Sequence, residues 1–200
     1  MQTLAVFPGT FDPLTLGHLD IIKRASKIFD KVIIAVAKSP SKHTLFDLDT
    51  RVLLCRESTK DLSNVSVTGF SGMLVDFLKE KNANILVRGV RTVADYDYET
   101  QLAGMYRIAM PDMEIVMLPT NASVSFISST LVREVIIHKG DISKFVPEAV
   151  YSYVNKHKTS VLLILLLAMW TEEGRTLTLN NTLNWSVANL ARFTFMTIYK

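Results

Sequence analysis

Residues 8–18, directly after an apolar run, combine two glycines, two threonine hydroxyls and an imidazole. Gly9 and Gly17 have no Cβ, so their backbone can approach a phosphate closely, and Thr10 adds a hydroxyl donor. His18 places an imidazole donor at the start of a predicted helix, where unpaired N–H groups and the helix dipole favour anions. This spacing predicts a phosphate-binding turn. The alternative is that the Pro-Gly pair is an ordinary turn and that His18 is a polar residue capping the helix.

A pair of arginines follows the apolar run at 85–87. Arg88 and Arg91 lie three residues apart beside Gly89, where a strand is expected to end. Guanidinium groups bind phosphate oxygens through forked donors, so the pair predicts a second anion site. The alternative is a pair of exposed surface charges.

Three successive hydroxyl residues follow the apolar run at 115–118 and precede a predicted helix. They are Ser128, Ser129 and Thr130. Side-chain and backbone donors at a helix N-terminus suit triphosphate oxygens. The same residues also fit a simple run of helix-capping side chains.

The elements that must position these groups follow from the alternation of short β-branched runs with stretches of helical period. Strands are predicted at 4–7, 32–37, 65–68, 85–87 and 115–118. Helices are predicted to begin after Gly17, at 48 behind Asp47 as N-cap, at about 73, 96 and 128, and near Pro147, and the fifth is expected to stop at Gly140. The near-continuous apolar strands fit a sheet covered on both faces. The predicted fold is an α/β fold with a five-stranded, mainly parallel, doubly wound sheet.

Composition narrows the class of protein. The 200 residues are 48% hydrophobic and 20% charged, which predicts a folded domain rather than a disordered chain. A net charge of +3 is too small for a dedicated nucleic-acid-binding protein. Cys55 is the single cysteine and the sequence opens without a charged and apolar leader, which together indicate a cytoplasmic protein.

The alternation of strand-like and helical segments stops near residue 159. We therefore predict one domain over residues 1–158 and a C-terminal extension of unknown role over 159–200. The extension contains an unbroken run of ten apolar residues at 161–170. About 20 residues are needed to cross a bilayer as a helix, so a packed or interfacial helix is favoured over a membrane anchor.

The motif Gly9-Thr10-Phe11-Asp12-Pro13, followed by Thr15-Leu16-Gly17-His18, resembles the signature of the nucleotidyltransferase superfamily in its Thr-x-Gly-His form. This resemblance implies a dinucleotide-binding type of α/β fold and transfer of a nucleotidyl group from a nucleoside triphosphate. Residues 39–42, 88–102 and 125–133 are similar to the corresponding segments of the phosphopantetheine adenylyltransferase family. That family makes dephospho-coenzyme A from ATP and 4′-phosphopantetheine in coenzyme A biosynthesis, and the resemblance covers residues 1–158.

The resemblance also implies roles for individual residues. His18, Lys42 and Arg91 would act on the reacting phosphates. The acceptor would contact Thr10, Lys42, Leu74 and Arg88. The ATP side would comprise Thr10, Phe11, His18, Gly89, Val90, Arg91, Glu99, Val124, Ser125, Phe126, Ile127, Ser128, Ser129 and Thr130. Val124 departs from the family pattern, since some members have tryptophan there, and this affects the packing of the loop rather than its hydroxyl donors.

The resemblance further implies Mg²⁺ bridging the phosphates, held by substrate oxygens and water with no protein ligand, and a homo-hexamer. Two other functions stay open. One is the same chemistry on another acceptor, such as a pyridine mononucleotide, against which Lys42 and the segment from Arg88 to Glu99 argue. The other is a catalytically silent nucleotide-binding module, against which the presence of His18, Lys42 and both arginines argues.

Overall fold

The computed structural model describes residues 2–39 and 44–157. The chain divides into two compact units, Met1–Lys156 and His157–Lys200, and the elements described here belong to the first. Lys42 and the apolar run at 161–170 lie outside the described residues.

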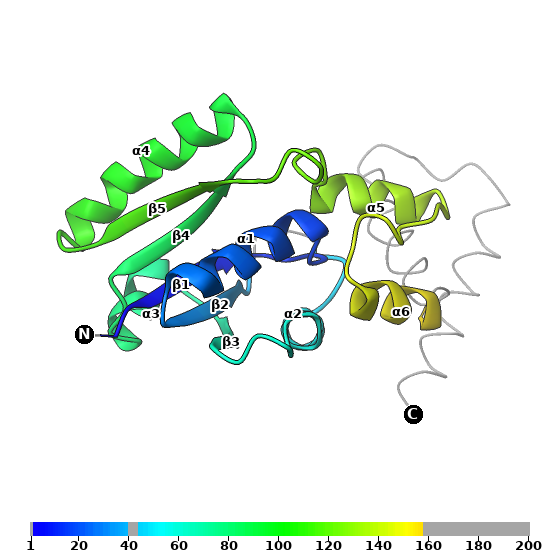
Figure 1. Ribbon diagram of the computed structural model, residues 1–200, viewed down its shortest axis with the longest axis horizontal. Coiled ribbons are helices and arrows are strands. Elements are labelled where there is room, and N and C mark those ends of the chain that lie inside the picture. The colour runs from blue at the N-terminus through cyan, green and yellow to red at the C-terminus, as the bar shows by residue number, and fades with distance from the viewer. Residues whose placement is uncertain (1, 40–43, 158–200) are drawn as a thin grey trace, which may run out of the picture. The chain divides into compact units, whose positions relative to one another are not determined.

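Five parallel strands form a single sheet (Figure 1). The order across the sheet is β3-β2-β1-β4-β5, and every neighbouring pair is parallel. The predicted fold class is confirmed. The chain order reverses between β1 and β4, and the carboxyl ends of strands at such a point form the crevice in which open α/β sheets bind ligands. The strands are β1 (Leu4–Gly9), β2 (Lys31–Ala37), β3 (Val65–Phe70), β4 (Ile85–Val90) and β5 (Glu114–Pro119).

Helices cover both faces of the sheet, as right-handed crossovers between these strands require. Leu86 and Gly89 are three residues apart in β4 and so point to opposite faces. Leu86 packs in one buried cluster with Phe77 and Leu78 of α3, whereas Gly89 lies against Ile21 of α1. The helices are α1 (Leu16–Ile28), α2 (Leu48–Ser58), α3 (Leu74–Glu80), α4 (Val93–Ala109), α5 (Ser129–Ile137) and α6 (Glu148–Lys156).

Strands β1, β3 and β4 run two or three residues beyond their predicted ends. Pro8 and Gly9 pair with Ala35 and Val36 of β2, so the Pro-Gly pair belongs to the strand and is not the turn that it resembles. β4 likewise includes Arg88, which therefore leaves the sheet at a fixed strand position rather than from a loop.

Helices α1 and α4 begin earlier than predicted because threonines cap them. Thr15 is the N-cap of α1, which starts at Leu16 rather than after Gly17. The Thr92 hydroxyl accepts the N–H of Asp95 at 3.1 Å, so α4 starts three residues before its predicted position. Hydroxyl side chains at an N-cap satisfy donors that the first helical turn leaves unpaired.

Two further helix-end predictions have opposite outcomes. Asp47 is confirmed as the N-cap of α2 and accepts the N–H of Thr50 at 2.8 Å. α5 ends at Ile137, before the predicted stop at Gly140, and Lys139 takes the left-handed conformation with φ of 57°. Gly140 does not end the helix, but it avoids a close contact, since a Cβ there would lie 2.7 Å from the side chain of Val135.

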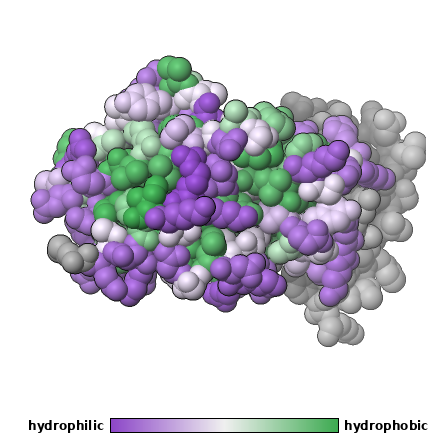
Figure 2. Space-filling model, viewed as in Figure 1, coloured by the Kyte–Doolittle hydropathy of each residue, from purple (hydrophilic) through white to green (hydrophobic). Residues whose placement is uncertain are grey.

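The surface of α4 carries a series of exposed apolar side chains. Val93, Met105 and Ile108 are 77%, 67% and 86% exposed, and Tyr96 and Tyr98 are more than half exposed. Apolar residues reach the surface in the region of α4 and β5 (Figure 2). Within the described ranges, no helix is both long enough and apolar enough to span a bilayer.

Candidate active site

Most of the predicted site residues that the structure describes lie where the carboxyl ends of β1, β4 and β5 meet the starts of α1, α4 and α5. Leu74 is the exception, because it follows β3 at the other edge of the sheet. β1 and β4 are neighbours in the sheet, so the segment after Gly9 and the segment around Arg88 lie side by side. The sequence separates these segments by about 80 residues, and the parallel pairing alone brings them together.

His18 is both a helix-capping residue and a candidate phosphate ligand. Its Nδ1 accepts the backbone N–H of Thr15 at 3.1 Å and lies 3.0 Å from the Thr15 hydroxyl. The Thr15 hydroxyl in turn accepts the N–H of His18, which completes a capping box. A neutral imidazole whose Nδ1 accepts carries its proton on Nε2. Capping of the helix therefore involves Nδ1 of His18, and Nε2 is the atom that could donate to a phosphate.

The charge state of His18 follows from its surroundings. Burial, together with the positive charge of Arg91, lowers the pKa of His18 from 6.5 to about 4. The ring is therefore neutral at pH 7, and Nε2 serves as an N–H donor rather than as a cation. A neutral N–H donor in a fixed position can stabilise negative charge that develops on a phosphate oxygen.

Gly9 is required by an aromatic ring. A Cβ on Gly9 would lie 2.8 Å from the tip of the Phe11 ring, which also packs edge-on against His18 at 5.2 Å between centroids. Phe11 has a φ of 49°, a left-handed conformation that is uncommon for a bulky residue. Close approach to Phe11 is therefore a structural reason for this glycine, and its predicted close approach to a phosphate stays a prediction.

Gly17 has a similar structural reason. Its missing Cβ would lie 3.3 Å from the carbonyl oxygen of Val124 and 3.6 Å from that of Ile127. The loop after β5 therefore packs directly on the first turn of α1. This contact brings residues 124–127 to the predicted site, although Ile127 itself is buried and Phe126 is exposed.

Arg88 makes a forked ion pair with Glu99. Its Nε donates to Oε2 of Glu99 at 2.7 Å, and its Nη2 donates to Oε1. Its Nη1 donates to the carbonyl of Pro8 at 3.3 Å, which links β4 to β1. The side chains are only 24% and 10% exposed, so Arg88 is not the solvated surface charge that a lone Arg-x-x-Arg pattern would suggest.

Arg91 is held by Asp95 at the start of α4. Its Nε lies 3.1 Å from Asp95 Oδ2, and its backbone N–H donates to the same oxygen at 3.0 Å. Burial alone would raise the pKa of Asp95, but these hydrogen bonds and the charge of Arg91 lower it below its usual value. Arg91 thus faces the site with a fixed guanidinium, and its charge acts on His18.

The hydroxyl run before α5 divides between the two roles considered for it. Ser128 is the N-cap, and its hydroxyl accepts the N–H of Leu131 at 3.2 Å. Ser129 donates its hydroxyl to the carbonyl of Pro13 at 2.8 Å. The backbone N–H groups of Ser129 and Thr130 have no hydrogen-bond acceptor among the described residues. They are the donors that the first turn of α5 could offer to an anion.

The other predicted residues lie around this edge. Gly89 and Val90 end β4, and Leu74 begins α3, after the carboxyl end of β3, where it packs partly buried against the sheet. The hydroxyl of Thr10 lies 3.2 Å from that of Ser39, which joins the segments after β1 and β2.

Sequence reasoning gave no role to three charged residues beneath the site. The carboxylate of Asp12 accepts the N–H groups of Leu45 and Phe46 at 2.7 and 2.9 Å, and burial raises its pKa. Arg133 donates to the carbonyl of Asp12 at 2.7 Å. Arg51 is 2% exposed although it is an arginine. The available signal was its position, three residues before Leu54 on the buried stripe of α2.

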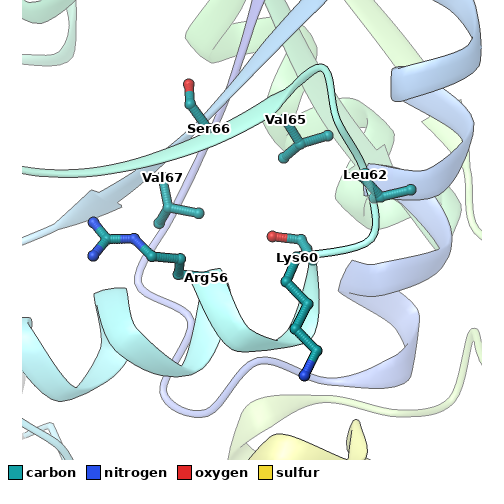
Figure 3. A pocket seen from close by; sticks show the side chains of 7 residues that line it. Arg56, Lys60, Leu62, Val65, Ser66 and Val67 are labelled. Carbon is teal, nitrogen blue, oxygen red and sulfur yellow. The ribbon is translucent and has the colours of Figure 1, made fainter.

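A shallow pocket of about 330 Å³ lies elsewhere, at the amino-terminal end of β3 and the carboxyl end of α2 (Figure 3). None of the predicted site residues lines it. Its lining consists of Arg56, Thr59, Lys60, Leu62, Val65, Ser66 and Val67. Across the described part of the chain, no group of three or more His, Cys, Asp or Glu side chains is arranged to hold a metal ion.

Known proteins share the sequence pattern and the fold of this chain. The family model described as cytidylyltransferase-like matches residues 6–135. A phosphopantetheine adenylyltransferase from Tolumonas auensis is 56% identical over 146 residues, which span 73% of this chain and 89% of that protein. A solved structure of a proposed nicotinate-nucleotide adenylyltransferase from Vibrio parahaemolyticus superimposes with a TM-score of 0.61. That match covers 79% of this chain and 94% of the other at 23% identity, so it concerns the fold alone.

Proposed function

This chain belongs to the phosphopantetheine adenylyltransferase family, and we propose that the site described above performs the reaction for which the family is named. The reaction transfers an adenylyl group from ATP to 4′-phosphopantetheine and gives dephospho-coenzyme A and pyrophosphate, a step of coenzyme A biosynthesis. The observation that carries this proposal is the 56% identity to a relative whose length this chain spans to 89%.

The reaction needs no general base. A phosphate monoester has a second pKa of about 6, so the acceptor phosphate is largely dianionic at neutral pH and can attack the α-phosphorus directly. The tasks left to the protein are to align two anions, to reduce their repulsion and to stabilise charge on the α-phosphoryl group and the departing pyrophosphate. Neutral and cationic donors suit these tasks better than an acid–base pair.

We assign the neutral Nε2–H of His18 to the α-phosphoryl oxygens in the transition state. The capping interaction at Nδ1 supports this assignment because it fixes both the tautomer and the ring orientation. Arg91, which lies close enough to His18 to act on its pKa, would contribute positive charge on the nucleotide side. We also assign the free N–H groups of Ser129 and Thr130 to ATP phosphates.

We assign Arg88 to the acceptor phosphate, together with Thr10, Leu74 and Lys42. The fork between Arg88 and Glu99 leaves the remaining N–H groups of the guanidinium for a ligand, and the Pro8 contact places them beside the end of β1. Glu99 would therefore act on the acceptor side through Arg88, in addition to the ATP contact that the family resemblance implies.

Mg²⁺ enters this proposal as part of the nucleotide substrate. The carboxylates near the site have other partners: Asp12 binds two backbone N–H groups, Glu99 binds Arg88 and Asp95 binds Arg91. This donor set fits an ion carried by phosphate oxygens and water, which would neutralise part of the triphosphate charge.

We further propose a homo-hexamer that functions in the cytoplasm. The exposed apolar side chains of α4, Val93, Met105 and Ile108 among them, support burial against other copies of the chain. Analytical ultracentrifugation of the full chain tests the assembly, and a monomer at micromolar concentration would contradict it.

The direct test of the activity is pyrophosphate release from MgATP in the presence of 4′-phosphopantetheine. Identification of dephospho-coenzyme A by mass spectrometry would support the proposal. Absence of this product from folded protein would contradict it, and release with nicotinate mononucleotide alone would assign the site to a different acceptor.

A further inference from the structure

Arg51 lies on α2 with its guanidinium buried beneath the predicted site. Its Nη1 donates to the carbonyl oxygens of Thr10 at 2.7 Å and Ala37 at 2.8 Å, and its Nε donates to that of Phe46 at 3.0 Å. These carbonyls belong to the residue just after β1, to the last residue of β2 and to the turn before α2. One buried cation therefore ties three separate segments together at the ligand-binding edge of the sheet.

The buried guanidinium of Arg51 is bound by carbonyl oxygens rather than by a carboxylate. Among the described residues, no carboxylate forms an ion pair with Arg51. Asp12 acts on it through space and holds the N–H groups of Leu45 and Phe46, so the same turn is bound from both sides. Burying a guanidinium without a bound carboxylate is costly, and an apolar side chain would fill the same position at lower cost. Its presence calls for a role other than packing.

The bond to Thr10 determines where the next N–H points. In a planar trans peptide the C=O and N–H groups point in opposite directions. Because the Thr10 carbonyl points at Arg51, the N–H of Phe11 points away from it. No described residue accepts that N–H, and Phe11 itself has a left-handed φ of 49°.

We infer that Arg51 is a positioning residue, which orients the peptide between Thr10 and Phe11 so that the Phe11 N–H donates to a phosphate of the nucleotide. Arg51 itself, 2% exposed, does not touch the substrate. The planar guanidinium suits this task because it reaches three carbonyls in fixed directions, which a lysine ammonium cannot do. The inference rests on the proposed function insofar as the ligand is ATP.

The test compares Arg51→Lys with Arg56→Lys, a matched change on the same helix at an exposed arginine that lies outside the predicted site (Figure 3). Calorimetry measures the affinity of each full-length variant for MgATP and for adenosine. We expect Arg51→Lys to weaken MgATP binding at least tenfold and adenosine binding less than twofold, because only the phosphate contact is lost. Arg56→Lys should change neither. Equal weakening of both ligands, or no weakening, would overturn the inference.

A second measurement does not depend on folding of a variant. Hydrogen exchange of the Phe11 amide in the unaltered protein should slow at least tenfold when inorganic pyrophosphate is added, while pyrophosphate leaves the exchange of core amides unchanged. Unchanged exchange at Phe11 would overturn the inference. Failure of the proposed function would look different. Arg51→Lys would still lose affinity for MgATP and pyrophosphate would still slow exchange at Phe11, but the unaltered protein would form no dephospho-coenzyme A.

Discussion

Both carboxylate oxygens of Glu99 accept hydrogen bonds from the guanidinium of Arg88, so a residue on α4 fixes a charged side chain that leaves the sheet from β4. The 10% exposure of Glu99 and the 24% exposure of Arg88 place the pair where solvent screens it weakly. A buried pair of this kind is costly to break from one side, because the other charge is left without a partner.

The first prediction concerns this pair. Glu99→Gln keeps the shape of the side chain but removes its charge, so Arg88 should lose its fixed orientation. We expect the KM for 4′-phosphopantetheine to rise about tenfold, with a smaller change in the KM for ATP. Steady-state kinetics with each substrate varied in turn measures both constants.

Arg88→Ala is the control for the Glu99 prediction. It removes the side chain that we assign to the acceptor phosphate, so it should raise the same KM at least as much and lower kcat as well. If both variants change only the KM for ATP, the assignment of Arg88 to the acceptor is wrong.

The second prediction separates the two atoms of His18. An asparagine side chain can place Oδ1 where Nδ1 lies and so keep the bond to the Thr15 N–H, but it has no atom at the Nε2 position. His18→Asn should therefore lower kcat by about 10², roughly 2.7 kcal/mol of barrier, while ATP affinity stays within several-fold. Turnover kinetics and ATP binding measure the two effects.

His18→Ala completes this comparison. It should lower kcat similarly and should also destabilise the fold by about 1 kcal/mol, because the capping interaction is lost. Near-normal turnover in His18→Asn would show that the ring is structural only.

The third prediction follows from the ionisation of His18. Its pKa falls from 6.5 to about 4 on folding, so between these pH values the unfolded chain binds more protons than the folded one. His18 therefore favours folding fully above about pH 6.5, and this contribution is lost as the pH falls toward 4. The raised pKa of Asp12 changes the stability with pH in the opposite direction. Asp12 is present both in the unaltered protein and in His18→Asn, so a comparison of the two cancels its effect.

Melting temperatures of the unaltered protein and of His18→Asn, measured from pH 7 to pH 4.5, isolate this contribution. The unaltered protein should lose stability relative to the variant as the pH falls. A difference that stays constant, or that grows in favour of the unaltered protein, would show that folding does not lower the pKa of His18.

Much of the fold could be predicted from the sequence, and the reason is local. The β-branched runs near Ile34 and Leu86 and the N-cap at Asp47 are patterns within a few residues, and the structure confirms them. The errors arose where a local signal had two meanings. The Pro-Gly pair at 8–9 signals a turn but forms the end of β1 and pairs with β2. Threonine caps at 15 and 92 start two helices earlier than the apolar spacing indicates.

The site could be predicted less completely because several of its contacts run to main-chain atoms. Arg51 binds three carbonyls and Asp12 binds two amides, and a carbonyl or amide looks the same at every position of a sequence. The contact between Gly9 and the ring of Phe11 could not be predicted either, because Phe11 takes a left-handed φ that is uncommon for a bulky residue.

The fourth prediction concerns the C-terminal extension, residues 159–200. All the residues assigned to the reaction precede position 134. The extension carries Arg175, Arg192 and Lys200 against Glu172 and Glu173, a net charge of 3 − 2 = +1, so its removal barely changes the attraction of ATP. A chain ending at Lys158 should keep turnover per folded subunit within about threefold, less than ~1 kcal/mol in barrier height.

The apolar run at 161–170 is removed by the same truncation, so solubility and assembly should respond more than turnover. Active-site titration combined with sedimentation of the truncated chain measures both. A folded, soluble truncation with turnover reduced a hundredfold would show that the extension contributes to the active site.

The central claim is that this site transfers adenylate to 4′-phosphopantetheine. The most direct measurement is kcat/KM for pyrophosphate release from MgATP with 4′-phosphopantetheine and with nicotinate mononucleotide, on the same preparation. We predict a preference of at least 10³ for 4′-phosphopantetheine, because binding the wrong acceptor would leave buried charged groups such as Arg88 without a phosphate in position. Equal use of the two acceptors, or a preference for the mononucleotide, would contradict the account.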